Sequence, residues 1–150
     1  MKVLVTGAGF CKPVMKENLD YLASFANEVV NFATSKPHTA EEILAAWDGV
    51  DGIIAGVEPY TAEMLEKAPP SLKVISRYGV GFNSIDVEAA KKRGILVTNT
   101  PGANSAAVAE LAMGLLLAVV RNIPSNSATI KAGKWERQMS RSEEHTSELQ

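Results

Sequence analysis

The stretch Arg77-Tyr78-Gly79-Val80-Gly81 carries residue types that could bind an anion. Its two glycines flank Val80, and a cation stands directly before them. Glycines let a backbone turn sharply and leave N–H groups exposed, and a row of N–H donors beside an arginine suits a carboxylate. An ordinary strand-to-helix loop has the same composition, so the residues alone leave both interpretations open.

A second glycine-containing stretch, Val5-Thr6-Gly7-Ala8-Gly9, looks like the start of a dinucleotide-binding loop. Such a loop needs a third glycine for close packing of helix on strand, and Lys12 stands at that place. The next strand should end in an acidic residue for the ribose hydroxyls, but it ends near Asn31. We therefore interpret this stretch as a turn.

The other reactive side chains predict neither a catalytic group nor a metal site, because no His, Cys or carboxylate pair has metal-ligand spacing. His38 precedes a helix cap and is expected on a surface loop, whereas His145 lies in a polar tail. Cys11 has no histidine nearby and is expected to be a small buried or loop residue. The acidic residues are spread over helix faces, where we expect them to be solvated.

Composition narrows the function classes. The chain is 46% hydrophobic with a net charge of -2, which fits a globular protein and gives no electrostatic signal for nucleic acid. The longest apolar run, Ala106 to Val120, contains Glu110 and is too short to cross a bilayer, so no membrane partner is expected. A single cysteine and the absence of room for a signal peptide before Val3 predict a cytoplasmic protein.

Short apolar strands alternate with helical patterns along the first part of the chain. Strands are expected at 3–5, 29–30, 52–55, 74–75 and 95–97, and helices at 14–25, from 39 onward, at 61–67 and at 83–93. This alternation predicts right-handed crossovers and a parallel sheet covered on both faces. Five such strands predict an α/β fold of the flavodoxin-like, doubly wound class.

Several helix ends can be read from local residues. Thr39 and Glu42 form a Thr-x-x-Glu capping box. Asn83 is expected to cap the fourth helix with Asp86 in its first turn, and Gly94 to end that helix at the C′ position.

The pattern changes after Pro101. A helix from Ser105 to Arg121 is apolar nearly all round and is expected to be buried on most sides, against a following domain. Pro124 opens a further helix to about Ala132. The polar segment Arg141–Gln150 has no apolar periodicity and matches a translated sequencing adapter, so we expect it to have no structural role.

From Ser76 to Gly114, the order of loop, helix, strand, loop and apolar helix resembles the D-2-hydroxyacid dehydrogenase family. These NAD-dependent enzymes interconvert 2-oxo and D-2-hydroxy acids, and the resemblance runs from Val3 to about Arg137. It implies that residues 1–98 form the substrate-binding domain and that 99–140 contain the first helices of a truncated Rossmann NAD-binding domain. The catalytic histidine, glutamate and arginine and the glycine-rich nucleotide loop would lie beyond residue 150, so the chain itself is expected to be inert.

The resemblance also assigns site residues. The backbone N–H groups of Val80 and Gly81 would hold the substrate carboxylate, and Arg77 would serve a carboxylate or a phosphate. Val80 would also approach the nicotinamide, and Val108 would line the nicotinamide side of the cleft. The implied cofactor is NAD, with NADP possible, and the complete enzyme is expected to be a homodimer.

Within the family, the segment looks closest to phosphoglycerate dehydrogenases and to glyoxylate or hydroxypyruvate reductases. Some phosphoglycerate enzymes place an arginine for the phosphate just after the third strand, where this chain has Gly56-Val57-Glu58. The substrate therefore stays open. Two alternatives are a corepressor resembling C-terminal-binding proteins, with NAD-linked dimerisation, and a free-standing flavodoxin-like ligand module, which would not need the apolar helix after Ser105.

Overall fold

The computed structural model describes residues 1–135, so the predicted polar tail Arg141–Gln150, with His145, lies outside the described residues. The chain divides into two compact units, of which the first is Met1–Ala103 and the second begins at Asn104.

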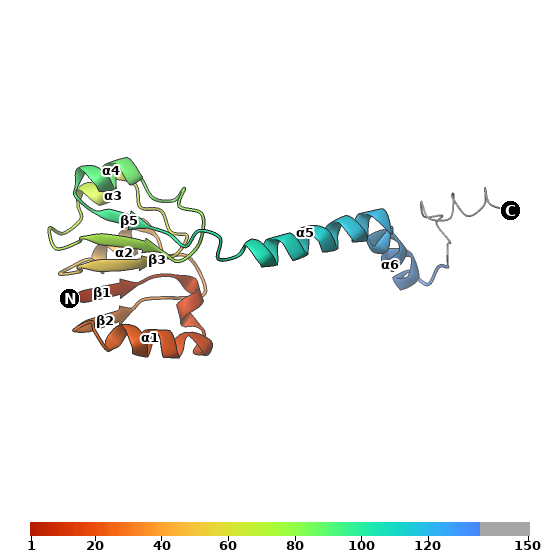
Figure 1. The fold of residues 1–150 in the computed structure, drawn as a ribbon, viewed down its shortest axis with the longest axis horizontal. Helices are drawn as coiled ribbons and strands as arrows, with labels where there is room; N and C mark the ends of the chain where they lie inside the picture. The colour runs from red at the N-terminus through yellow and green to blue at the C-terminus, as the bar shows by residue number, and fades with distance from the viewer. Residues whose placement is uncertain (136–150) are drawn as a thin grey trace. The chain divides into compact units, whose positions relative to one another are not determined.

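The first unit is built on a five-stranded parallel sheet (Figure 1). Its strands are β1 (Lys2–Val5), β2 (Glu28–Asn31), β3 (Gly52–Ala55), β4 (Val74–Arg77) and β5 (Leu96–Thr98). Their spatial order is β2-β1-β3-β4-β5, with Val3 of β1 paired to Val29 on one side and to Gly52 on the other. This is the order of flavodoxin-like doubly wound sheets, and the predicted fold class is confirmed.

Helices pack on both faces of the sheet. Successive side chains of a strand point to opposite faces, so each face has its own apolar core. On one face, Val3 and Val5 pack with the helix α1 (Lys16–Ala23). On the other face, Leu4 and Ile53 belong to a larger core. The helices of that core are α2 (Ala40–Ala45), α3 (Ala62–Glu66) and α4 (Val87–Lys92).

Two of the predicted helix ends are confirmed. Thr39 caps α2 through the complete capping box, in which its Oγ1 accepts from the Glu42 N–H at 3.3 Å and its own N–H donates to Glu42 Oε2 at 2.8 Å. Gly94 follows α4 with φ +70°, the left-handed conformation that glycine adopts without a steric penalty.

The predicted cap of α4 is wrong. Asp86, not Asn83, is the N-cap, and its Oδ1 accepts from the Ala89 N–H at 2.9 Å. The helix starts late because the preceding residues pair with Tyr60 instead: the Tyr60 N–H donates to the Ser84 carbonyl at 2.7 Å, and the Asp86 N–H donates to the Tyr60 carbonyl at 2.9 Å. A tertiary contact thus extends the loop after β4 as far as Asp86.

The second unit contains α5 (Ser105–Val120) and α6 (Ile123–Lys131), close to the ranges predicted for its helices. The expectation that the apolar helix is buried on most sides is wrong for this structure, in which α5 has no buried residue. An apolar helix is buried only where another surface meets it, which its composition alone cannot supply. Within the described residues, no single helix is long and apolar enough to cross a bilayer, although α5 and α6 taken together, bent by 63°, satisfy those criteria.

Candidate functional site

The loops that follow the strands meet at the carboxyl edge of the sheet, where doubly wound folds bind ligands. Backbone hydrogen bonds tie them to one another. The Tyr78 N–H after β4 donates to the Ala55 carbonyl of β3 at 2.8 Å, and the Thr6 N–H after β1 donates to the Ile54 carbonyl at 3.0 Å. The Thr100 N–H after β5 donates to the Gly79 carbonyl at 3.1 Å. The edge is therefore a connected set of loops.

The loop after β4 presents several backbone donors without partners among the described residues. The N–H groups of Val80 and Gly81 make no hydrogen bond within residues 1–135, and both residues are exposed. The loop is nevertheless held in place, because the Asn99 side-chain amide donates to the Val80 carbonyl at 2.8 Å. Gly79 has φ +145° and its N–H donates to the Arg77 carbonyl at 2.9 Å, which makes the sharp turn before the two donors.

Arg77 folds back over this loop. Its guanidinium donates to the Tyr78 carbonyl, and a Cβ built on Gly79 would lie only 2.6 Å from Arg77 Nη1. The buried Nε of Arg77 has no hydrogen-bond partner among the described residues. The structure thus places Arg77 at the end of β4, with its guanidinium against the Gly79 turn that leads to the free N–H groups of Val80 and Gly81.

The two glycines of this loop differ in what they are for. Gly79 needs its positive φ and the space that Arg77 fills. At Gly81, no described residue other than its two chain neighbours has an atom within 4 Å of the place where a Cβ would stand, and its backbone is not left-handed. The fold does not require a glycine at Gly81, so the open space there is available to a ligand.

The glycines after β1 are packed against an aromatic ring. A Cβ on Gly9 would lie 2.8 Å from Tyr78 Cε1, and the rings of Phe10 and Tyr78 meet edge to face at 5.0 Å. The chain then forms the short 3-10 helix η1 (Ala8–Cys11). A dinucleotide-binding loop needs open N–H groups at the start of an α-helix. This stretch does not fit a pyrophosphate, in agreement with its interpretation as a turn.

A buried polar cluster at the same edge was missed by the sequence analysis. Glu58 is only 1% exposed, so the expectation of solvated acidic residues is wrong for this side chain. Its Oε2 accepts from the Thr6 hydroxyl at 3.4 Å, and that hydroxyl lies 3.1 Å from the hydroxyl of Tyr60. Burial raises the pKa of Tyr60, and the charge of Glu58 raises it further, while the hydrogen bond with Thr6 opposes both. Glu58 lies between β3 and α3 rather than on a helix face, and this position was the available signal.

The remaining predicted residues lie elsewhere. Val108 belongs to α5 in the second unit, where its side chain is exposed. His38 is buried rather than on the surface, because its ring stacks on Phe32 and its Nε2 lies 2.6 Å from the Phe32 carbonyl. Cys11 is exposed, with Sγ 3.0 Å from the Ala8 carbonyl. Among residues 1–135, no group of three or more His, Cys, Asp or Glu side chains could hold a metal ion.

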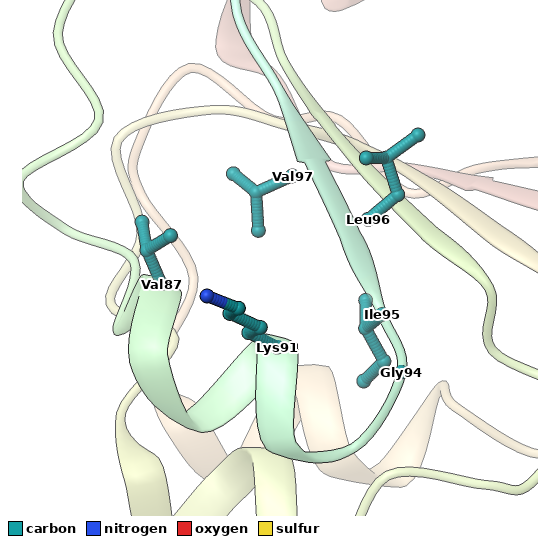
Figure 2. Close-up of a pocket in the computed structure, with 6 residues that line it drawn as sticks. All are labelled: Val87, Lys91, Gly94, Ile95, Leu96 and Val97. Atoms are coloured by element: carbon teal, nitrogen blue, oxygen red, sulfur yellow. The ribbon is translucent and has the colours of Figure 1, made fainter.

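Two hollows adjoin β5. The larger lies between α4 and the start of β5 and is lined by Val87, Lys91, Gly94, Ile95, Leu96 and Val97 (Figure 2). This hollow is lined by residues at the amino end of β5, opposite the loops of the carboxyl edge. Lys91 is the only charged residue in its lining. The smaller, of about 210 Å³, is lined by Phe82, Val87, Val97, Thr98 and Asn99. Asn99, which lines the smaller hollow, also donates to the Val80 carbonyl in the loop of the free donors.

The chain also matches proteins of known family. Residues 3–148 match the model of a family described as D-isomer specific 2-hydroxyacid dehydrogenase, catalytic domain. The chain is 48% identical over 101 residues to a D-3-phosphoglycerate dehydrogenase of Methanocaldococcus jannaschii, covering 66% of this chain and 19% of that protein. It is 43% identical over 105 residues to a hydroxypyruvate reductase of Thermotoga maritima, covering 69% of this chain and 34% of the relative.

Among solved structures, an acyclic imino acid reductase in complex with NADPH and D-Arg has a TM-score of 0.78 and 26% identity. The match covers 91% of this chain and 43% of the reductase. In all three comparisons the chain spans less than half of the other protein.

Proposed function

Because the chain belongs to the D-isomer specific 2-hydroxyacid dehydrogenase family, we propose that it supplies the substrate-binding part of an oxidoreductase. The reaction is the interconversion of a 2-oxo acid and a D-2-hydroxy acid with a nicotinamide cofactor. One observation carries the proposal: at the carboxyl edge of a doubly wound sheet, the unpaired N–H groups of Val80 and Gly81 follow the Gly79 turn, against which the Arg77 guanidinium lies.

The task of the loop is to bind and orient the acid. Two N–H groups and a guanidinium can each donate a charge-assisted hydrogen bond to a carboxylate, which fixes the acid by the end that does not react. The carbon next to that carboxylate, C2, is thereby held at a set distance from the loop. Orientation of this kind removes much of the entropic cost of bringing two reactants together.

The cofactor accepts or donates the hydride at C2 when it is bound. Its pyrophosphate does not fit the Gly7–Gly9 turn, because Tyr78 fills the space beside Gly9. We propose that a part of the enzyme outside residues 1–135 binds most of the cofactor, with Val80 and Val108 next to the nicotinamide. NAD is the proposed cofactor and NADP the alternative, since the related imino acid reductase is in complex with NADPH.

The domain arrangement and assembly belong to the same proposal. Residues 1–98 are the substrate-binding domain, and 99–140 begin the nucleotide-binding domain. The complete enzyme is a homodimer, which is supported by the exposed apolar side chains of α5. These include Leu111, Met113, Leu115, Leu116 and Leu117.

The test uses a fusion of residues 1–140 to the nucleotide domain of a related dehydrogenase. Gly81→Val places a side chain where the carboxylate is proposed to bind, so the KM for the 2-oxo acid should rise. Loss of one or two charge-assisted hydrogen bonds costs about 1.5–3 kcal/mol each, or roughly tenfold to a hundredfold in affinity apiece. Arg77→Ala should weaken substrate binding in the same direction.

Two controls make the result interpretable. NADH affinity should be unchanged in Gly81→Val, and its free energy of unfolding should match that of the parent, because the site is open. A folded Gly81→Val enzyme with unaltered kinetics would remove the carboxylate from this loop.

A further inference from the structure

The free N–H groups of Val80 and Gly81 belong to peptide groups whose carbonyls are hydrogen bonded. A peptide group is planar, so in its trans form the carbonyl of one residue and the N–H of the next point in opposite directions. The Gly79 carbonyl shares a peptide group with the Val80 N–H, and the Val80 carbonyl shares one with the Gly81 N–H. Both peptide bonds are trans. Whatever holds these two carbonyls therefore also sets the direction of the two donors.

Both carbonyls are held by the segment that follows β5. The Thr100 N–H donates to the Gly79 carbonyl at 3.1 Å, and the Asn99 side-chain amide donates to the Val80 carbonyl at 2.8 Å. A carbonyl can only accept, so the nitrogen of the Asn99 amide is the atom that faces it. The N–H groups of Val80 and Gly81 consequently point away from that segment, and successive N–H groups on one side of a loop can bind an anion together.

The backbone by itself does not select this orientation at Gly81. Glycine adopts positive and negative φ about equally readily, so the peptide group between Val80 and Gly81 can turn over at little steric cost. A turned peptide group would direct its carbonyl, instead of its N–H, at an incoming carboxylate. The hydrogen bond from Asn99 is lost in that arrangement, and this bond therefore favours the orientation that presents the donor.

We propose that Asn99 is a positioning residue of the loop after β4, which fixes the Gly81 N–H toward the carboxylate of the acid. It acts through the peptide group between Val80 and Gly81, and not by touching the acid. Thr100 does the same for the Val80 N–H, but through its backbone, which side-chain substitutions other than proline leave intact. The inference rests on the proposed function, because it takes the carboxylate to bind at these two N–H groups.

The first measurement needs neither a variant nor a ligand. The 15N relaxation of the labelled chain reports the motion of single backbone amides. The amides of Val80 and Gly81 should be as rigid as the sheet, with order parameters of about 0.85, although they make no hydrogen bond within residues 1–135. Values below about 0.6 in the parent chain would show that the donors are not held and would overturn the inference.

Asn99→Ala removes the donor to the Val80 carbonyl. The Gly81 amide should then gain motion, seen either as an order parameter below about 0.6 or as exchange on the microsecond-to-millisecond timescale. Thr98→Val is the matched control, because it removes a side-chain hydrogen bond one residue earlier, from Thr98 Oγ1 to Ser76 Oγ at 3.1 Å. The control should leave the Gly81 amide as rigid as in the parent. Equal motion in the two variants would indicate a general loosening and overturn the inference.

Gly81→Ala supplies a rescue that a purely structural role of Asn99 would not show. Alanine disfavours positive φ, so it opposes the turning of the peptide group through the backbone alone. Its Cβ enters open space. The double variant Asn99→Ala/Gly81→Ala should therefore recover a rigid amide at position 81. A double variant as mobile as Asn99→Ala would mean that Asn99 does not act by selecting the orientation of this peptide group.

The second measurement links the orientation of the amide to binding. The chain is titrated with D-glycerate, a D-2-hydroxy acid, while the backbone amide NMR signals of Val80 and Gly81 are followed. The affinity should fall about threefold to tenfold in Asn99→Ala, because losing one neutral hydrogen bond lowers the population of the competent loop by about that factor. Thr98→Val should bind D-glycerate as the parent does.

The outcomes separate the two proposals. If D-glycerate shifts neither amide signal in the parent chain, the proposed function falls, and the role of Asn99 in binding falls with it. If D-glycerate binds the parent and a folded Asn99→Ala chain equally well, the inference is overturned and the proposed function stands. If Asn99→Ala does not fold, the relaxation of the parent decides: rigid amides at Val80 and Gly81 support the inference, and mobile ones overturn it.

Discussion

Two glycine-containing loops stand at the same edge of the sheet, and they use their glycines differently. In the loop after β1, the space beside Gly9 is filled by the ring of Tyr78. In the loop after β4, no residue of the described range 1–135 fills the space beside Gly81. The first loop looks more like a nucleotide-binding motif in sequence, yet it is the second that leaves open the place of a glycine side chain. A glycine indicates a ligand only where the fold leaves its missing side chain unreplaced.

A single residue explains much of the difference. Tyr78 belongs to the stretch after β4, but its ring packs on Phe10 and lies against Gly9. The same chain segment therefore closes the first loop and, two residues later, opens the second at Val80. The two loops therefore pack against each other, and the Tyr78 ring from the loop after β4 supports the loop after β1.

The largest expected effect tests this contrast directly. Gly9→Ala would place a Cβ against the Tyr78 ring and should lower the free energy of unfolding by about 1–3 kcal/mol, the usual cost of overpacking. The matched change Gly81→Ala enters open space and should stay within about 0.5 kcal/mol of the parent. Urea denaturation followed by circular dichroism measures both.

A double variant separates the effect of the packing clash from other causes of destabilisation. In a Tyr78→Ala background the clash is gone, so adding Gly9→Ala should cost much less than it does in the parent. Equal losses at Gly9 and Gly81 in the parent would show that the two loops do not differ as the structure indicates.

The fold was predictable because its signals are local. Short apolar runs such as Gly52–Ala55 mark strands that are buried in a parallel sheet, and β3 has those bounds. The Thr39 capping box is formed by residues three positions apart, so it too can be read without a structure. The Arg77–Gly81 loop was found by its glycines and its cation.

What could not be predicted depends on contacts between particular side chains, some of them far apart in the sequence. Glu58 is buried because Thr6, 52 residues earlier, supplies a hydroxyl, and His38 is buried because it stacks on Phe32. No composition or periodicity shows these partners. For the same reason the sequence could not show that Tyr78 fills the space beside Gly9, and this contact is what distinguishes the two loops.

The next prediction tests where the loop after β4 ends and α4 begins. Asp86→Ala removes the cap of α4 and should cost about 1 kcal/mol of unfolding free energy, whereas Asn83→Ala should change it by less than about 0.5 kcal/mol. Chemical denaturation of the two variants measures the difference. A loss at Asn83 that equals the loss at Asp86 would mean that the helix begins earlier and that the loop with the free donors is shorter than described.

The smallest effect concerns a third loop, which leads from β2 to α2 and is held by a charged cap as well as by the stacking of His38 on Phe32. The Thr39 N–H donates to the Glu42 carboxylate at 2.8 Å, which holds the pKa of Glu42 below its usual value of 4.5, and the charge of His38 lowers it further. A depressed pKa in the folded state favours the ionised form, so this stabilisation is present above pH 4.5 and is lost as the pH falls through the folded value. Glu42 is fully exposed, so the effect should be small and weakened by salt. The measurement is the urea midpoint above and below pH 4.5. As the pH falls, the midpoint should decrease more steeply in the parent than in Glu42→Gln. Glu41→Gln, which changes an exposed neighbour in the same turn, should behave like the parent. If Glu42→Gln keeps the full parental dependence on pH, the cap does not contribute, and the third loop is fixed by the stacking of His38 on Phe32 alone.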